Sequence, residues 1–301
     1  MTNRIQHVLG TRFRRIITGD PSGVPPWLAQ ISAGDDQGLF LPTDAPWIVH
    51  GDLATLIGGI RALLIQALHP GTLAGVAQHS RYETDPLGRL AGTTKWLTIL
   101  TFGSMGAIAT ESNRVNAMHQ RVQGEYQRAD GTTANYRATD PRLLQWVHVA
   151  FTDSFLRTFQ LYSPRRKLAL ADEYVAKWAA AVTFLGLADA PASEAQLEAA
   201  MEQYLSDGEL SVNEQTRRVV AFIKRPPLSR VALLVYAFLF QAALVSIPPA
   251  YQTMLGLKAR PKWLVVPIAR TLMRLMQLAI GSHSPLEEAA MDRLSRIGVV
   301  N

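Results

Sequence analysis

Apolar residues recur every three or four positions along most of the chain, the spacing that places them on one face of a helix. Asp52 is suited to cap the first such segment, and this helix is expected to end near Leu68, because helical geometry is disfavoured just before Pro70. Asp140 and Pro141 form a second start signal, a cap followed by proline at the first helical position. The pattern therefore predicts a chain of capped amphipathic helices.

Further helices account for most of the remaining length. They are expected up to about residue 79, over 86–101, from a break at 102–104 through about 123, over 167–186, 193–206, 210–224, 228–247 and 262–281, and from 284 onward. Residues 124–139 are expected to form a polar loop, since strand-like alternation is almost absent. The predicted fold class is all-α: a Pro- and Gly-rich arm over residues 1–50 packs on a single multi-helix domain over 51–301.

The composition permits a large buried core, because 48% of the 301 residues are hydrophobic. The chain contains no cysteine, which excludes disulfides, thiolate-bound zinc, iron–sulfur clusters and a cysteine nucleophile. Any iron must therefore be bound through His, a carboxylate, Tyr or Met.

The formal net charge of +6 suits an anionic ligand, a membrane surface or nucleic acid. The basic clusters are short and lack interleaved aromatic residues, so no nucleic-acid partner is expected. Residues 1–15 lack the apolar core of a secretory signal, so a cytoplasmic location is expected, with peripheral membrane association through this basic segment left open. The apolar run 231–247 is at the lower limit for spanning a bilayer, and a buried core helix is favoured.

Among the seven histidines, two lie on apolar helix faces. His119 flanks an apolar stripe close to a predicted helix end, and His148 lies between Leu144 and Phe151 on one helical face. Taken alone, this spacing favours ordinary core histidines whose ring nitrogens are hydrogen-bonded. The sharper interpretation is that His148 is a pocket residue.

His69 and His79 close two predicted helices, where an imidazole can cap free carbonyl groups. That structural explanation suffices, although the turn at His69 is also suited to line a cavity. The fingerprints of zinc proteases, serine hydrolases and dinucleotide-binding proteins are missing from the sequence.

Several short motifs follow one another in a distinctive order over roughly residues 45–245. They are residues 66–70 (QALHP), His79, Tyr82, Asp85-Pro86, Arg89, Thr93, Phe102-Gly103, His119, Val122, Gly124, Tyr136, Asp140-Pro141, Trp146-Val147-His148 and Asp153-Ser154. In this order they resemble the family of MpaB-like oxygenases and latex-clearing rubber oxygenases. The resemblance implies a globin-reminiscent helical fold that encloses a b-type haem.

The latex-clearing branch carries an Arg-x-x-Lys-Thr motif, which Arg89 and Thr93 match, whereas Gly92 replaces the lysine. Because that lysine lies on the distal side of the haem in the rubber-cleaving branch, its loss puts polyisoprene cleavage in doubt.

Two further motifs of that branch are matched in part. His119 matches the proximal haem histidine of a His-x-x-x-Arg motif, but position 123 is Gln. His148 matches the histidine of a later Thr-x-His pair, with Trp146 in place of the threonine.

The resemblance implies a role for each matched residue. His119 is the expected iron ligand, with His148 as the alternative ligand or as a catalytic pocket residue. Arg89 is expected on a haem propionate or over the distal face, and Thr93, one turn later, points the same way. The remaining expected cofactor contacts are Trp96, Phe102, Phe151, His69 and His79.

The expected function is haem b-dependent oxygenation of an apolar, isoprenoid-like or other lipophilic substrate with dioxygen. The alternatives are a haem-dependent oxidase or peroxidase-like enzyme that acts on a small metabolite, and a non-catalytic helical protein that binds haem or lipid.

Overall fold

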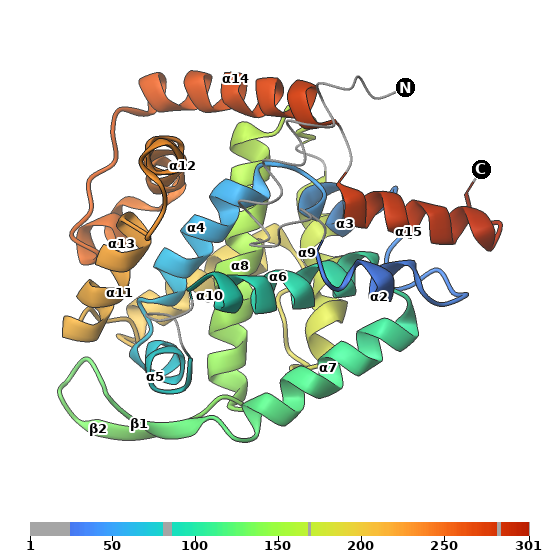
Figure 1. Ribbon diagram of the computed structural model, residues 1–301. Coiled ribbons are helices and arrows are strands. Elements are labelled where there is room, and N and C mark those ends of the chain that lie inside the picture. Colours follow the sequence, from blue (N-terminus) through green and yellow to red (C-terminus); the bar gives the residue numbers. More distant parts are fainter. Residues whose placement is uncertain (1–24, 81–85, 168–169, 282–283, 301) are drawn as a thin grey trace. The chain divides into compact units, whose positions relative to one another are not determined.

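The computed structural model describes residues 25–80, 86–167, 170–281 and 284–300, apart from the side chains of residues 86–90, 231 and 280 (Figure 1). Within this part of the chain the protein is mostly helical, with one antiparallel sheet of two strands. The all-α fold class is therefore confirmed.

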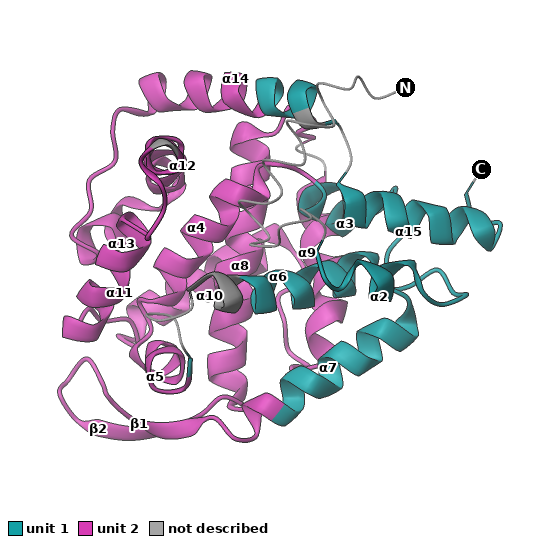
Figure 2. Cartoon of the chain, viewed as in Figure 1, with its two compact units in different colours: residues 1–51, 80–117, 274–301 teal, residues 52–79, 118–273 magenta. Residues whose placement is uncertain are grey.

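The chain forms two compact units (Figure 2). Unit 1 comprises residues 1–51, 80–117 and 274–301, and unit 2 comprises residues 52–79 and 118–273. The described elements of unit 1 are α2 (Leu28–Ser32), α3 (Ala45–His50), α6 (Pro86–Phe102), most of α7 (Met105–His119) and α15 (Pro285–Arg296). Those of unit 2 are α4 (Thr55–Gln66), α5 (Pro70–His79), β1 (Gln123–Gln127), β2 (Thr133–Arg137), α8 (Pro141–Tyr162), α9 (Ala171–Thr183), α10 (Glu194–Ser206), α11 (Glu214–Lys224), α12 (Arg230–Ser246), α13 (Pro249–Met254) and most of α14 (Lys262–Ile280). The expected division into an arm over 1–50 and a body over 51–301 stays a prediction; residues of the expected body belong to both units.

Helices α4 and α8 pack closely against each other at the centre of unit 2. The start of α8 follows the sequence signal, because Asp140 accepts a hydrogen bond from the Arg142 amide at 2.8 Å and Pro141 occupies the first helical position. Gly58 permits the close approach of the two helices, since a β-carbon there would lie 2.7 Å from Cδ1 of Phe155.

Unit 1 is built around aromatic residues of α3 and α6. The rings of Trp47 and Phe102 meet edge to face at 4.8 Å, and the Trp47 indole donates to Glu287 of α15 at 3.1 Å. Nδ1 of the buried His50 lies 2.8 Å from the Thr101 hydroxyl. Helix α3, in the segment expected to be an arm, therefore belongs to the core of this unit.

The expected polar loop over 124–139 is wrong, because this segment forms a β-hairpin whose strands pair from Gln123 with Arg137 to Gln127 with Thr133. The preceding helix also ends at His119, four residues earlier than expected. Burial alternates along both short strands: Gly124 and Tyr126 of β1 are half-buried, and Ala134 and Tyr136 of β2 are buried. So short a pattern is easily missed in a helical chain.

Helix α12 only partly fulfils the expectation of a buried core helix. Residues 242–244 are buried, whereas Leu234 and Val235 in its first half are 75% and 46% exposed. Among the described residues, no helix is both long and apolar enough to cross a bilayer.

The glycine pair in α4 gives a matched test of this packing. Gly58→Ala should lower the free energy of unfolding by about 1–3 kcal/mol, because the added methyl group would overlap Phe155 and Thr158. Gly59→Ala should leave it unchanged or raise it by up to about 1 kcal/mol, because no atom lies within 4 Å of the new β-carbon and alanine favours helix. Urea unfolding of both variants measures the difference. Equal effects would contradict the close α4–α8 contact.

Candidate functional site

His148 is buried on α8 and has one ring nitrogen without a partner among the described residues. The Thr152 hydroxyl donates its only hydrogen to the His148 carbonyl at 2.7 Å, and its oxygen lies 3.5 Å from Nδ1 of the same histidine. The hydroxyl can therefore only accept from Nδ1, which favours the tautomer with the proton on Nδ1. Nε2 then carries a lone pair, and this buried atom has no hydrogen-bond partner among the described residues.

Burial also keeps this ring neutral. The side chain is 4% exposed, and desolvation of the charged form lowers the pKa of His148 to about 4. A neutral imidazole with a free Nε2 is the form that binds iron or accepts a hydrogen bond from a ligand. Because buried polar atoms are nearly always satisfied, the orphaned Nε2 indicates a ligand position.

The side chains beside His148 on α8 are apolar and incompletely covered. Leu144, Val147 and Phe151 are half-buried, and Phe151 and the buried Phe155 lie with ring centroids 5.9 Å apart. These positions are three, four or seven residues apart, so they share one face of the helix. The expected pairing of His148 with Phe151 on one apolar face is therefore seen.

His119 is the last residue of α7 and is half-buried. No hydrogen bond joins its ring to any residue that the structure describes, and burial lowers the pKa of His119 below its ordinary value. The apolar stripe expected beside it includes the buried Ile108 and Val115, but Met118 is 46% exposed. His119 thus offers a neutral, unengaged imidazole at a helix end.

The rings of His69 and His79 both have protein partners. Nδ1 of His69 accepts from the Gly71 amide at 3.1 Å, and its Nε2 lies 3.4 Å from the Glu209 carboxylate. Nε2 of His79 donates to the Gln123 carbonyl at 3.0 Å and so ties α5 to the hairpin. These contacts match the structural interpretation, and the cofactor contacts expected for both residues stay predictions.

The remaining expected site residues lie on α6 in unit 1. Thr93 and Trp96 are half-buried, Phe102 is buried against Trp47, and the Arg89 side chain lies outside the described part of the chain. A β-carbon added at Gly92 would have no atom within 4 Å, so the position where the related branch has lysine is open. The structure therefore groups His69, His79, His119, His148 and Phe151 within unit 2, and Arg89, Thr93, Trp96 and Phe102 within unit 1.

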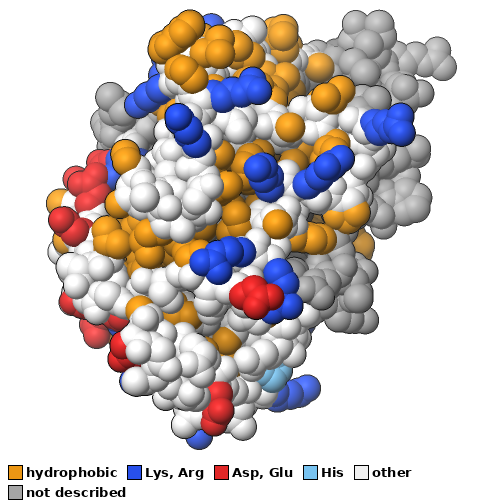
Figure 3. Space-filling model, turned by 90° about the vertical axis from the view of Figure 1, so that its left-hand side faces the viewer, with side chains coloured by type: hydrophobic (Ala, Val, Ile, Leu, Met, Phe, Trp, Pro, Cys, Tyr) orange, Lys and Arg blue, Asp and Glu red, His pale blue; other side chains and the backbone are white. Residues whose placement is uncertain are grey.

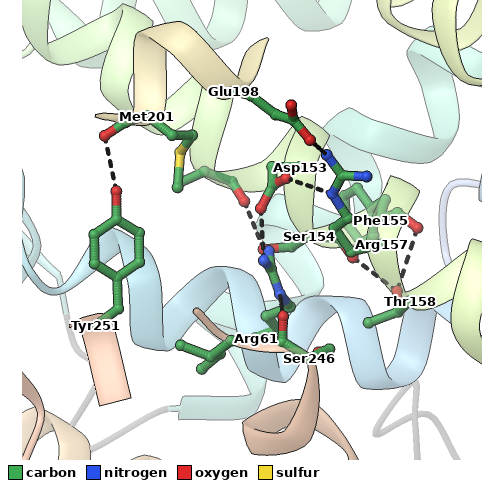
Figure 4. Close-up of polar contacts among 12 residues, drawn as sticks. Arg61, Asp153, Ser154, Phe155, Arg157, Thr158, Glu198, Met201, Ser246 and Tyr251 are labelled. Carbon is green, nitrogen blue, oxygen red and sulfur yellow. Dashed lines mark hydrogen bonds and ion pairs between the residues drawn. The ribbon is translucent and has the colours of Figure 1, made fainter. Parts of the chain in front are cut away.

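A buried polar network on α4 and α8 was not expected from the sequence (Figure 4). Arg61 is 1% exposed, and its guanidinium lies 2.6 Å from Asp153 and donates to the Ser154 hydroxyl at 2.8 Å and the Ser246 carbonyl at 3.2 Å. The other Asp153 oxygen accepts from Arg157 at 3.2 Å. The available signal was an arginine in the middle of the otherwise apolar helix TLIGGIRALLIQ.

The network extends to the surface through Arg157, which also contacts Glu194 and Glu198 of α10. Because both Asp153 oxygens are occupied by guanidinium groups, this carboxylate is not placed to act as a general base. The network is therefore a brace between helices. Within the described residues no cluster of three or more His, Asp or Glu side chains is placed to hold a metal ion.

Comparison with known proteins yields one match. The family model described as "ER-bound oxygenase mpaB/B'/Rubber oxygenase, catalytic domain" matches residues 47–278, well over half of the chain. No curated protein and no solved structure matches significantly.

The Arg61–Asp153 pair gives a stability prediction. Asp153→Asn should lower the free energy of unfolding by about 3–5 kcal/mol, because it leaves the buried Arg61 charge without its counter-ion. Glu198→Gln, the same acid-to-amide change at a 62% exposed partner in the network, should cost less than about 1 kcal/mol. Urea unfolding at neutral pH compares the two. A similar small cost for both variants would contradict the bracing role.

The neutral state of His148 gives a pH prediction for the cofactor-free protein. Below about pH 6.5 the unfolded chain takes up a proton that folded His148 does not accept until about pH 4, so stability is lost as the pH falls through this window. The shift corresponds to about 3 kcal/mol. His148→Phe should remove that part of the acid sensitivity, measured by urea unfolding at pH 7.5 and 4.5.

His79→Gln, which removes an exposed ring, is the matched control and should retain the acid sensitivity of the unmodified protein. An unchanged pH dependence in His148→Phe would show that this ring is not held neutral by the fold.

Proposed function

The chain belongs to the ER-bound oxygenase mpaB/B'/rubber oxygenase catalytic-domain family, and we propose that it is a haem b-dependent oxygenase of a lipophilic substrate. Family membership supports an enzyme of the oxidoreductase kind. The haem, the use of dioxygen and the class of substrate are the proposed part.

The unpartnered Nε2 of His148 is the observation that carries the proposal. A buried lone pair on a neutral imidazole requires a partner, and the described residues supply none. A bound cofactor or substrate with a polar atom at this position would satisfy it. The site residues therefore fit an additional bound group.

We assign the iron ligand to His119 and the pocket role to His148. His119 matches the proximal histidine of the related branch in sequence, and its ring is neutral and free of hydrogen bonds to the described residues. Bound haem would supply the one-electron and dioxygen chemistry that no side chain of this chain provides. His148 would then accept a hydrogen bond or a proton at Nε2 from the group beside it.

The α6 residues retain the roles that the resemblance implies. Arg89 would bind a haem propionate or face the distal side, and Thr93 would donate a hydrogen bond on the same side. Trp96 and Phe102 would contribute apolar walls. Gly92 leaves room where the rubber-cleaving branch has lysine, so a substrate other than polyisoprene is favoured.

The apolar face of α8 supports a lipophilic substrate. Leu144, Val147 and Phe151 are half-buried around His148, and no charged side chain lies on this face between residues 144 and 155. A polar substrate would lose its hydration there and gain only the one hydrogen bond that Nε2 of His148 can accept. The proposed reaction is therefore oxygenation of an apolar compound, with an oxidase or peroxidase-like reaction as the competing chemistry at the same cofactor.

An absorption spectrum of protein expressed with ample iron, as purified and after reduction, tests the cofactor. A Soret band is expected, and its absence would overturn the proposed enzyme. His119→Gly should lose the band or shift it, and added imidazole should restore the original spectrum by occupying the vacated ligand position. His148→Ala should retain haem while losing most of the oxygen consumption with a lipophilic substrate panel.

Arg128→Gln, a substitution of an exposed residue in the hairpin turn of unit 2, is the control and should not shift the haem spectrum. Loss of the Soret band in His148→Ala with retention in His119→Gly would exchange the two assignments. A haem protein that consumes no dioxygen with any reductant and substrate tested would indicate a binding protein instead.

A further inference from the structure

The basic charge of this protein is concentrated in one part of its sequence. Between Glu214 and Glu287 the chain contains no Asp or Glu, although it contains ten Lys and Arg residues. The whole chain has a formal net charge of only +6, so the remainder is net acidic. The basic stretch includes α12 and α14, which also carry most of the exposed large hydrophobic residues.

Helix α14 has apolar side chains on two opposite faces. One face is buried through Val265, Ala269 and Met273. The other carries an exposed stripe of Leu264, Ile268, Leu275 and Leu278, with exposed fractions of 39%, 47%, 58% and 69%. These residues are spaced four, seven and three apart, which places them in one line along the helix. A water-facing helix does not need this second apolar stripe.

Two further apolar groups are exposed on the same part of the chain. Trp263, at the start of α14, is 77% exposed, and Leu234 in the first half of α12 is 75% exposed. The two helices belong largely to unit 2, and the Arg260 amide before α14 donates to Gln241 of α12 at 3.2 Å. Figure 3 shows hydrophobic side chains gathered on this side of the molecule, with Lys and Arg side chains between them. Large apolar side chains exposed beside one another are typical of an interaction site.

The cations around these helices have no acidic partner among the described residues. They are Arg230, Lys258, Arg260, Lys262 and Arg274, all exposed. By contrast, Arg61, Arg142 and Arg157 elsewhere in unit 2 are all paired with carboxylates. Unpaired cations beside an apolar stripe are complementary to a surface that is both anionic and apolar.

We propose that the outer face of α14 within unit 2 (residues 262–273), together with the first half of α12, docks on an anionic lipid bilayer surface. The exposed apolar side chains of α14 would insert among the lipid acyl chains. The Lys and Arg side chains would pair with lipid phosphates, and Trp263 would lie at the level of the headgroups. Nucleic acid would match the charge but not the apolar stripe, and a second copy of this basic face would repel the first. This inference does not depend on the cofactor.

Trp263 allows a direct test, because it is the most exposed of the six tryptophans. The full-length protein is mixed with vesicles of phosphatidylcholine alone or with about one third phosphatidylglycerol, and binding is followed by co-sedimentation. Binding should be at least about tenfold tighter to the anionic vesicles and should weaken as salt is added. Lipids brominated on their acyl chains should quench the fluorescence of the bound protein, and Trp263→Phe should remove most of this quenching.

Paired variants separate the apolar and electrostatic contributions. Leu264→Ser/Ile268→Ser and Lys258→Glu/Lys262→Glu should each weaken binding by about tenfold or more. The matched controls are Leu205→Ser on α10, which also removes an exposed leucine, and Arg128→Glu in the hairpin turn. Both controls should bind like the unmodified protein, and thermal unfolding checks that every variant is folded.

Several outcomes would overturn the proposal. These are equal binding to both kinds of vesicle, no binding to either, or binding that the α14 variants do not weaken. A dimer that Leu264→Ser/Ile268→Ser dissociates, without vesicle binding, would assign the face to a second copy. Haem content is measured in parallel, so that failure of vesicle binding and failure of the proposed oxygenase are separate results.

Discussion

The buried ion pair between Arg61 and Asp153 is the constraint on which the helical arrangement of unit 2 depends. Taking two charges out of water is costly, and their attraction with ideal geometry roughly offsets that cost. The pair therefore adds little net stability compared with apolar side chains of the same volume. Its effect is specificity, because any shift of α4 along α8 would leave a buried charge without its partner. The Ser246 carbonyl on the same guanidinium extends this constraint to the end of α12.

That brace and the candidate site use different faces of one helix. Asp153 follows His148 by five residues, which places it roughly 140° away around α8. The polar contacts of Asp153 can therefore hold the helix while the face of His148 remains apolar and its Nε2 stays free of partners among the described residues. An imidazole kept neutral by burial is useful to a ligand only if its position is fixed, and rigid elements fix positions better than loops do.

Sequence reasoning succeeded where one local signal decides the structure. The cap at Asp140 and the Ser284-Pro285 start of α15 are such signals, and both helices begin as expected. It failed where long-range packing decides. The hairpin over 123–137 depends on Tyr136 reaching Gln78 of α5, and the role of Arg61 depends on a partner 92 positions later in the chain. For the site, the burial of His148 was predictable from its neighbours. The lone pair left on its Nε2 was not predictable, because the tautomer of the ring depends on the hydrogen bond that the Thr152 hydroxyl donates to the His148 carbonyl.

Helix α14 shows a more general limit of periodicity. Its apolar residues form two lines, and spacing alone cannot tell which line is buried, since both satisfy the helical repeat. Packing buries the line through Ala269 and leaves the line through Ile268 in water. Docking on a membrane would bring an enzyme that acts on lipophilic compounds close to its substrates. Such compounds partition into bilayers in proportion to their apolar surface, so their concentration at the membrane greatly exceeds that in water. A protein held there by α12 and α14 would meet its substrate more often without any change in the affinity of the site around His148.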